Sequence, residues 1–592
     1  MSRTTQANRG PPMLNSPVLT IATTGRAGAK TRQTTAEAFA AAVIGICLFG
    51  QLGALGLVGP DEPRYAWIAR AMSETGDWIT PRLYGAPWFE KPVLYYWLAG
   101  LGFKLGLSPE WAARLPSAFA ALAATIAIGL LAHRYYSREG ESSSITAILA
   151  AIVFASSVAG IGFARAATPD MLFSASITLA MACAAFLLPL GEAAARIGYE
   201  DGGREYFVLG LFGAFLGLGV LAKGPAAVIL AGGSIAIWAA VTKEWRAALR
   251  LAHPMAIVTF CLIALPWYLI CALRNPDFLR VFIFQHNFER YLTPMFQHIQ
   301  PFWFFIPITL LALVPWVAFL AAAIGEAAAS LKLKTWRTSP GFFFACWALF
   351  PVLFFSLSKS KLPSYILPGI PSLSLIATAS AEWVFRRSRA GAIAISALVG
   401  ATWAGLIFAA VHRFEKLPDY VTSNFDLSAI RIVAAAIAAT IAALLLITGA
   451  KQKFWWLVAL NSLIVIATVE IANSRLLPVL DPFVSARLHG IYIAQNSTHR
   501  FFTYELQRSW IYGLAFYAHR ELPEWSPTMT EPGTVLTTAK GYAEIRNSGT
   551  TERRFDALSQ GILYVPVGGR DVETNENETE APLQSPLDQI QK

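Results

Sequence analysis

Charged residues are scarce in this chain of 592 residues, because Asp, Glu, Lys and Arg make up only 14% of it. A soluble globular protein carries about 25% charged residues, so the chain has roughly half of the usual polar coat. Glycine and proline occur at ordinary frequency, which excludes collagen-like and low-complexity classes. The sequence also lacks an internal repeat, which argues against solenoids and against many transporter folds.

The positions of the cysteines do not indicate a disulfide framework. All five fall inside apolar runs, and none lies in the C-terminal region. They are Cys47, Cys183, Cys261, Cys271 and Cys346. We interpret them as small hydrophobic residues of a core.

Long apolar runs are what the sequence has in abundance. They recur between residues 35 and 473 and are long enough to cross a bilayer. The pattern predicts a polytopic α-helical membrane protein with about thirteen transmembrane helices. The expected spans are 35–58, 110–132, 143–160, 169–190, 206–222, 225–241, 254–273, 301–324, 341–357, 364–385, 390–411, 427–449 and 454–473.

Basic residues are concentrated in every second loop between the expected spans. With thirteen spans, the basic clusters all fall on the N-terminal side of the membrane, which predicts a cytoplasmic N-terminus and a C-terminal region outside. The clusters are Arg3, Arg9, Arg26, Lys30 and Arg32; Arg134 and Arg138; Lys243, Arg246 and Arg250; Lys332, Lys334 and Arg337; Arg386, Arg387 and Arg389; and Lys451 and Lys453. Lys223, Lys359 and Lys361 break this rule at the outer face, where cations suit a phosphate group or lipid headgroups.

The composition changes after the last apolar run. Short alternating stretches at 500–506, 534–538 and 561–566, with a helical stretch near 511–520, predict a small extracytoplasmic α/β domain. The expected organisation is a disordered cytoplasmic N-terminus (1–34), a transmembrane domain (35–473), an α/β domain (474–570) and a disordered acidic tail (571–592).

The first outer loop, 59–109, carries the densest polar chemistry. Asp61 and Glu62 precede a stretch with helical apolar spacing (Tyr65, Ile68, Ala69 and Met72), which predicts an amphipathic helix at the membrane interface. The two carboxylates could be simple partners of the helix dipole, or they could serve a function, because charges at membrane depth are costly. Glu90 and Lys91, taken alone, predict a surface ion pair.

Further ionisable residues fall on the same predicted face. Asp170 begins a span, where it could cap a helix. The others on that face are Arg290, His286, His298, Lys361 and Tyr365. The topology thus gathers carboxylates, cations, histidines and a tyrosine from distant parts of the sequence at one interface.

Four motifs make the sequence similar to the 4-amino-4-deoxy-L-arabinose lipid A transferases. These enzymes belong to the polyprenyl-dependent glycosyltransferases of GT-C type, which include the protein O-mannosyltransferases. The resemblance covers nearly the whole chain. The motifs are Asp61-Glu62-Pro63-Arg64-Tyr65-Ala66, Gly76-Asp77-Trp78, Phe89-Glu90-Lys91-Pro92 and Lys361-Leu362-Pro363-Ser364-Tyr365-Ile366-Leu367-Pro368.

The resemblance implies a donor, an acceptor and roles for the motif residues. The donor would be an undecaprenyl-phosphate-linked aminosugar and the acceptor a phosphate of lipid A, so that the enzyme masks negative charge and confers resistance to polymyxin and other cationic antimicrobial peptides. Asp61 and Asp170 would be catalytic, and Lys91, Arg290 and Tyr365 would hold the donor phosphate. The remaining motif residues expected to contact a ligand are Glu62, Arg64, Tyr65, Glu90 and Lys361.

The resemblance also bears on cofactors and partners. It requires no cofactor, although Glu90 with His286 or His298 offers ligands of the type that zinc binds. We expect a monomer in the bacterial inner membrane, surrounded by lipid and without a nucleic-acid partner.

Three other functions stay open at this stage. A protein or glycan glycosyltransferase would use a similar donor with a different acceptor. A lipid flippase or transporter would place polar residues at mid-membrane, whereas here they gather at one rim. A sensor would leave loop 59–109 without a role.

Overall fold

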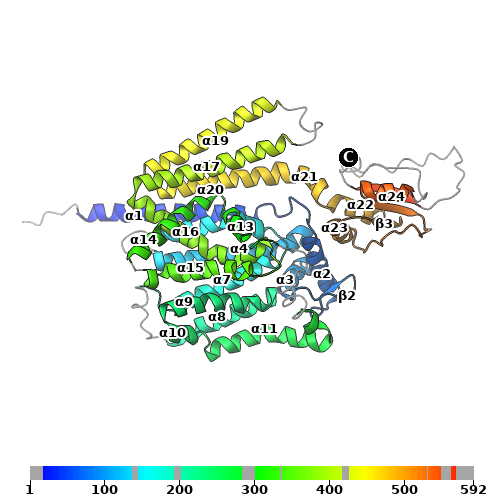
Figure 1. Cartoon of the computed structure of the whole chain (residues 1–592), viewed down its shortest axis with the longest axis horizontal. Helices are drawn as coiled ribbons and strands as arrows, with labels where there is room; N and C mark the ends of the chain where they lie inside the picture. Colours follow the sequence, from blue (N-terminus) through cyan, green and yellow to red (C-terminus); the bar gives the residue numbers. More distant parts are fainter. Residues whose placement is uncertain are drawn as a thin grey trace, which may run out of the picture.

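The structure is a computed structural model, and it describes residues 18–136, 144–191, 202–282, 300–333, 336–416, 426–529, 531–547 and 562–567 (Figure 1). Its first half contains α1 (Val18–Phe49), α2 (Asp61–Thr75), β1 (Arg82–Leu83), β2 (Ala86–Pro87), α3 (Leu94–Lys104), α4 (Pro109–Tyr136), α5 (Ser144–Ala155), α6 (Val158–Ala164), α7 (Asp170–Leu187), α8 (Gly202–Lys223), α9 (Ala226–Thr242), α10 (Trp245–Arg250) and α11 (Pro254–Arg274).

The second half begins with helices and ends in a small sheet. Its helices are α13 (Phe305–Ala312), η3 (Trp316–Ala318), α14 (Phe319–Leu333), η4 (Trp336–Thr338), α15 (Pro340–Ser356), η5 (Pro363–Gly369), α16 (Ile370–Arg387), α17 (Arg389–Phe414), α19 (Leu427–Ala450), α20 (Phe454–Ile471), η6 (Ala472–Leu476) and α21 (Leu477–Val484). The C-terminal unit adds α22 (Arg487–Gln495), β3 (Phe501–Tyr504), α23 (Arg508–Ala518), β4 (Gly533–Thr537), α24 (Ala539–Asn547) and β5 (Leu563–Val567).

The described residues contain seven helices that are long and apolar enough to cross a membrane, or nine if each of two bent pairs counts as one span. Three shorter apolar helices accompany them, at Gln33–Phe49, Ala226–Thr242 and Pro340–Ser356. The architecture is therefore the polytopic helical one that the apolar runs predict.

Three expected spans differ from straight helices. The segment 143–160 is bent by 62° between α5 and α6, and 301–324 is bent by 113° between α13 and the helix that starts at Trp316. The first span ends at Phe49, and residues 50–60 follow as an irregular segment. Hydropathy alone misses this early end because the segment stays apolar while its backbone bonds to other elements.

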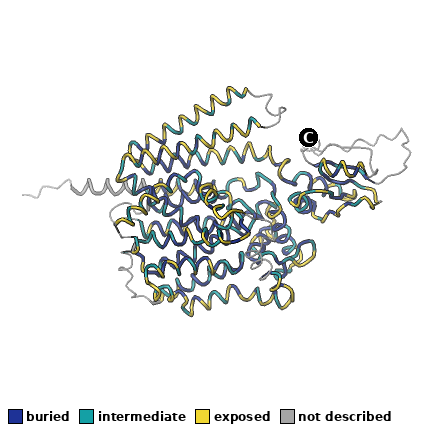
Figure 2. Tube along the Cα trace, viewed as in Figure 1, coloured by how far each residue is buried: buried dark blue, intermediate teal, exposed yellow. Residues whose placement is uncertain are grey.

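Exposed apolar faces surround the helical body. Figure 2 shows long exposed stretches along α11 and α19, on opposite sides of the molecule. Leu269 and Leu273 on α11 and Ile432 and Val433 on α19 are all at least 57% exposed. Such extensive apolar surface is stable in lipid and not in water.

The loop between α1 and α4 folds against one end of the helical body. Helix α2 packs on α3, α4 and α23, and the short hairpin β1–β2 lies beside it. Tyr65, Ile68, Ala69 and Met72 are buried, as their spacing predicts for one face of a helix.

The C-terminal unit is built on a three-stranded sheet of order β3-β4-β5. Strand β3 is parallel to β4, and β5 is antiparallel to β4. The strands lie in the three stretches whose alternation predicts them. Helices α22 and α23 pack together at the end of the helical body that carries α2 (Figure 1).

Candidate active site

Five of the residues singled out in the sequence meet at one end of the helical body. Asp61 starts α2, and Glu90 and Lys91 follow the β1–β2 hairpin. Asp170 starts α7, and Tyr365 lies in η5. Because each residue sits at or near the end of a helix on the same face, the fold brings them together.

A chain of ion pairs connects α2 to the segment after the hairpin. The guanidinium of Arg64 lies 2.5 Å from a carboxylate oxygen of Asp61 and 2.9 Å from one of Glu90. The ammonium of Lys91 lies 3.0 Å from the other oxygen of Glu90. The Glu90–Lys91 pair is only 13% exposed on both sides, so the expectation of a surface ion pair was wrong: the pair lies in a largely buried cluster.

Asp61 is the accessible member of this cluster. Its side chain is 53% exposed, against 10% for Arg64 and 13% for Glu90. Partial burial among protein atoms raises the pKa of Asp61, and the nearby carboxylates of Glu90 and Asp170 add to this effect. Arg64 and Lys91 oppose the rise. An accessible carboxylate with a raised pKa, among cations, is typical of a residue that binds or activates a ligand.

Aromatic rings hold Arg64 in place. Its guanidinium carbon lies 5.1 Å from the ring centroid of Tyr65, 5.5 Å from that of Trp88 and 5.6 Å from that of Tyr512. Tyr512 belongs to α23 of the C-terminal unit, so distant parts of the chain build this cluster together.

Asp170 does not cap its helix, contrary to one of its two interpretations. Pro169 occupies the N-cap position, and the carboxylate of Asp170 pairs instead with the ammonium of Lys223 at the end of α8. Lys223 also lies 5.3 Å from the ring centroid of Tyr365. The electrostatic influence of Lys91 reaches Asp170, so this second cluster adjoins the first.

Lys223 is a site residue that the sequence interpretation did not select. The only sequence signal was its position as a cation at the outer face, where basic residues are disfavoured. Its partner could not be predicted, because the pairing of α7 with α8 is a property of the packed helices.

Several polar atoms near these clusters are buried without a hydrogen-bond partner among the described residues. They include Nε of Arg64, Nε1 of Trp88 and the hydroxyl of Tyr96. An unpaired buried donor normally costs about 1–3 kcal/mol, so each such atom calls for an explanation. Three donors beside one accessible carboxylate suit a polar ligand with hydroxyl or phosphate oxygens.

Glu62 and Lys361, which were expected to contact a ligand, bond to other parts of the chain. Glu62 bonds with both carboxylate oxygens to Arg114 and accepts from the backbone amides of Val58 (2.9 Å) and Ala167 (2.7 Å), which leaves its oxygens occupied. Lys361 is 6% exposed and donates to the carbonyl of Ser358 in its own turn, at 2.5 Å. Glu62 thus holds backbone segments together, whereas Lys361, with a bond to a carbonyl, keeps its positive charge; contact of either residue with a ligand stays a prediction.

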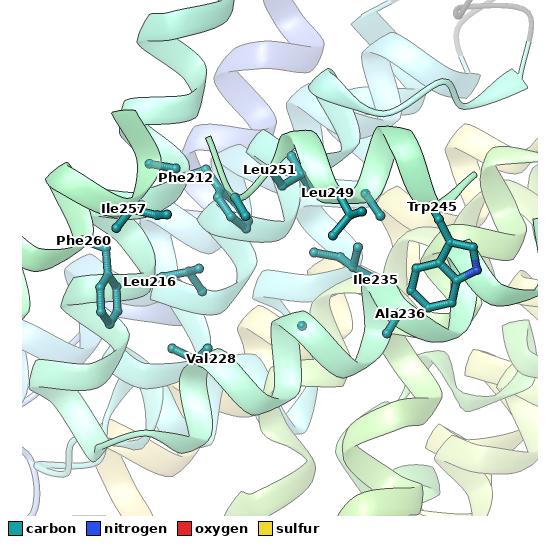
Figure 3. A pocket seen from close by; sticks show the side chains of 15 residues that line it. Phe212, Leu216, Val228, Ile235, Ala236, Trp245, Leu249, Leu251, Ile257 and Phe260 are labelled. Carbon is teal, nitrogen blue, oxygen red and sulfur yellow. The ribbon is translucent and has the colours of Figure 1, made fainter. Parts of the chain in front are cut away.

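An apolar cavity of about 380 Å³ lies away from these charges, between α8, α9, α10 and α11 (Figure 3). Among its lining residues are Phe212, Ile235, Trp245 and Phe260, and none of the described residues that line it is charged. It therefore lacks the groups that a sugar phosphate needs.

Comparisons with known proteins show which families the chain resembles. Residues 38–282, which include both clusters apart from Tyr365 and Tyr512, match the family model described as dolichyl-phosphate-mannose-protein mannosyltransferase. An undecaprenyl phosphate-alpha-4-amino-4-deoxy-L-arabinose arabinosyl transferase of Edwardsiella ictaluri is 35% identical over 321 residues, 54% of each chain. A protein of the same name from Yersinia enterocolitica is 33% identical over 327 residues, 54% of this chain and 55% of the relative.

Over about half of its length, this chain is similar to these arabinosyl transferases. It spans about half the length of the curated relatives that it matches. The crystal structure of ArnT from Cupriavidus metallidurans bound to undecaprenyl phosphate superposes with a TM-score of 0.67 and 22% identity, covering 92% of this chain and 100% of that chain. The apo structure of the same protein gives a TM-score of 0.68 and 21% identity, with 92% and 100% coverage. The fold of this chain is thus the helical GT-C fold of ArnT.

Three predicted site residues, His286, Arg290 and His298, lie outside the described residues. The metal site expected from Glu90 with either histidine therefore lies partly outside them too. Within the described part of the chain, no three His, Cys, Asp or Glu residues form a group that could hold a metal ion.

Proposed function

We propose that this chain transfers 4-amino-4-deoxy-L-arabinose from undecaprenyl phosphate to a phosphate group of lipid A. The observation that carries the proposal is the accessible carboxylate of Asp61 beside buried cations, on a chain whose relatives bear the name of this arabinosyl transferase. The solved ArnT with the same fold binds undecaprenyl phosphate, the expected product of the donor.

The chemistry fits the charges of the site. An oxygen of the acceptor phosphate attacks the anomeric carbon of the sugar, and the bond from that carbon to the undecaprenyl phosphate oxygen breaks. The electron pair of that bond stays on the leaving phosphate. The second pKa of a phosphate monoester is about 6, so an ionised acceptor oxygen exists at neutral pH and little base catalysis is needed.

Asp61 and Asp170 then act on the sugar and the acceptor. An amino group on the sugar is an ammonium at neutral pH, and it pairs well with an exposed carboxylate such as Asp61. Asp170, already paired with Lys223, holds that cation at the reaction centre.

The cations and Tyr365 act on the leaving group. We assign Lys91, Lys223 and Tyr365 to the departing phosphate, because contacts from cations and a hydroxyl strengthen as negative charge develops on a leaving group. Arg290 joins them in this proposal, with inversion at the anomeric carbon.

The amphipathic substrates set the expected orientation. Both carry lipid chains, so the reaction belongs at a membrane interface. We place the site and the C-terminal unit on the periplasmic side of the bacterial inner membrane, with a cytoplasmic N-terminus and thirteen spans, as the basic loops predict. The transfer adds positive charge to lipid A and would lower its attraction for cationic peptides such as polymyxin.

Mass spectrometry of lipid A tests the proposal. Cells lacking any other such transferase are compared with and without this chain, and with the Asp61→Ala variant. We expect aminoarabinose on lipid A phosphate only with the intact chain. Normal modification by the Asp61→Ala variant would contradict the assignment of Asp61.

A second candidate is a protein or glycan glycosyltransferase with a polyprenyl-phosphate sugar donor. The match of residues 38–282 to the mannosyltransferase family favours it. It predicts unchanged lipid A and a sugar on a protein or glycan, so the same cells decide between the two acceptors.

A further inference from the structure

The segment 50–60 joins α1 to Asp61 and has almost no backbone pairing of its own. The C-terminal unit and the helix before it supply the missing partners. The amide of Gly56 donates to Asp481 at 2.7 Å, and the amide of Leu57 donates to the hydroxyl of Tyr517 at 2.8 Å. Arg487 donates to the carbonyl of Gly53 at 3.0 Å.

Helix α4 holds the same segment from the other side. Arg114 donates to the carbonyl oxygens of Leu52, Leu55 and Gly56 at 2.6–2.8 Å. It also pairs with Glu62, which accepts from the amides of Val58 and Ala167. Through this carboxylate the segment before Asp61 is tied to the turn before Asp170.

The contact with the C-terminal unit is tight. Val58 forms an isolated antiparallel bridge with Ser485. A Cβ atom on Gly56 would come within 2.1 Å of the hydroxyl of Ser485 and 3.0 Å of the Cβ atoms of Ser485 and Arg487, so a larger residue would force these neighbours to shift. The segment therefore lies directly against the chain between α21 and α22.

A buried polar network links the groups that hold the segment. Arg487 pairs with Asp481 at 2.6 Å and approaches Glu110 of α4 at 3.5 Å. Glu110 accepts from the hydroxyl of Tyr517 at 2.8 Å. Asp481, Glu110 and Tyr517 are each no more than 6% exposed. Removing one member of such a network leaves buried groups unpaired, so the network has one favoured geometry.

We propose that α21, α22 and α23 form a positioning clamp that fixes segment 50–60 and, through it, the orientation of Asp61. Tyr517, Asp481 and Arg487 are its positioning residues. Figure 1 shows α22 and α23 at the end of the body that carries α2, and α2 packs on α23. The expected effect on the rate of transfer rests on the proposed function of Asp61. The expected effect on the structure of segment 50–60 does not.

The first test compares two tyrosines of the C-terminal unit in the full-length protein. Tyr517→Phe removes the hydroxyl that joins Leu57 to Glu110. Tyr504→Phe is the matched control, because its hydroxyl bonds to Glu544 at the exposed surface, away from the segment. We expect Tyr517→Phe to lower kcat about tenfold, because a small misplacement of a reacting group is costly. KM for the donor stays within about twofold, and the control behaves like the wild type.

The second readout is amide hydrogen exchange over residues 53–58, which requires no turnover. We expect exchange there to accelerate about tenfold in Tyr517→Phe and to stay unchanged in Tyr504→Phe, with no change in α7 of either variant. If the wild type transfers no aminoarabinose, the proposed function fails, and exchange alone then decides whether the clamp exists.

Two outcomes would overturn the proposal. In the first, residues 53–58 of Tyr517→Phe exchange their amide hydrogens as slowly as those of the wild type. In the second, they exchange faster but the variant of an active enzyme keeps the wild-type kcat. If Tyr517→Phe does not fold, Arg487→Lys replaces it under the same criteria. Lysine keeps the charge but cannot bond to Asp481 and Gly53 together. Arg500→Lys, from an exposed pair with Glu531, is its control.

Discussion

Asp61 and Glu62 are neighbours in the sequence, yet they belong to two different regions. The open region around Asp61 contains an exposed carboxylate, the cations near it and donors that have no hydrogen-bond partner in the described part of the chain. The closed region around Glu62 contains a carboxylate that is 8% exposed and fully bonded to Arg114 and two amides. The difference shows that two adjacent acidic residues can have different roles. Asp61 is left available to a ligand, and Glu62 holds the backbone segment that carries Asp61.

The largest expected effect is on the open side. Asp61→Asn should lower the rate of transfer by about 10²–10³-fold, because it removes the exposed carboxylate that we propose pairs with the sugar ammonium, and breaking a buried charge pair costs about 3–5 kcal/mol. Stability should not fall, since the raised pKa means that the charged form is disfavoured in the folded protein. Transfer rates and thermal unfolding of the purified protein measure both quantities. A large loss of stability would show that Asp61, like Glu62, mainly stabilises the fold.

The closed side should respond in the opposite way. Glu62→Ala leaves the guanidinium of Arg114 buried without its partner, and we expect about 3–5 kcal/mol of destabilisation. Thermal unfolding and membrane yield measure the loss. Glu74→Ala is the control, because its pair with Arg70 on the same helix is 62% exposed on the Glu side, and such pairs contribute about 0–1 kcal/mol. Equal losses in both variants would contradict the division of roles.

Lys223 tests whether the second cluster belongs to the open region. Lys223→Gln should lower kcat about 10–100-fold, because a hydrogen bond to a charged group contributes about 1.5–3 kcal/mol. Lys223→Arg keeps the charge and should restore part of the rate. Lys451→Gln, an exposed position elsewhere, is expected to be silent. If Lys223→Gln were equally silent, Lys223 would have to be removed from the site.

The smallest effect concerns protonation of Asp61. Carbodiimide labels protonated carboxyl groups, so its reaction with Asp61 should decline as pH rises through the raised pKa. Glu90→Gln removes a negative neighbour and should move this decline to lower pH, whereas Glu74→Gln should leave it in place. Mass spectrometry of the labelled peptide gives the midpoint. A shift to higher pH in Glu90→Gln would show that another group controls Asp61.

Much of this arrangement could be predicted from the sequence. The spacing of Tyr65, Ile68 and Met72 predicts α2, because it repeats with the period of a helix. The meeting of Asp61, Lys91 and Asp170 follows from topology, because alternate membrane crossings return the chain to the same face.

The other contacts of the site depend on which helices pack against one another. The pairing of Lys223 with Asp170, the contact of Tyr512 with Arg64 and the saturation of Glu62 by Arg114 all join residues far apart in the sequence. Periodicity is a local signal and carries no information about such neighbours. For the same reason it predicted single spans where α5–α6 and α13–α14 are bent.

The clamp also sets an order of events during synthesis. Gly56 and Leu57 bond to residues that follow them by 425 and 460 positions. A ribosome reads the chain from its N-terminus, so Asp61 enters the membrane long before Tyr517 exists. The segment that carries the reactive carboxylate thus acquires its final geometry among the last steps of assembly. A prematurely terminated chain would keep most of its helices but would lack the contacts that orient Asp61.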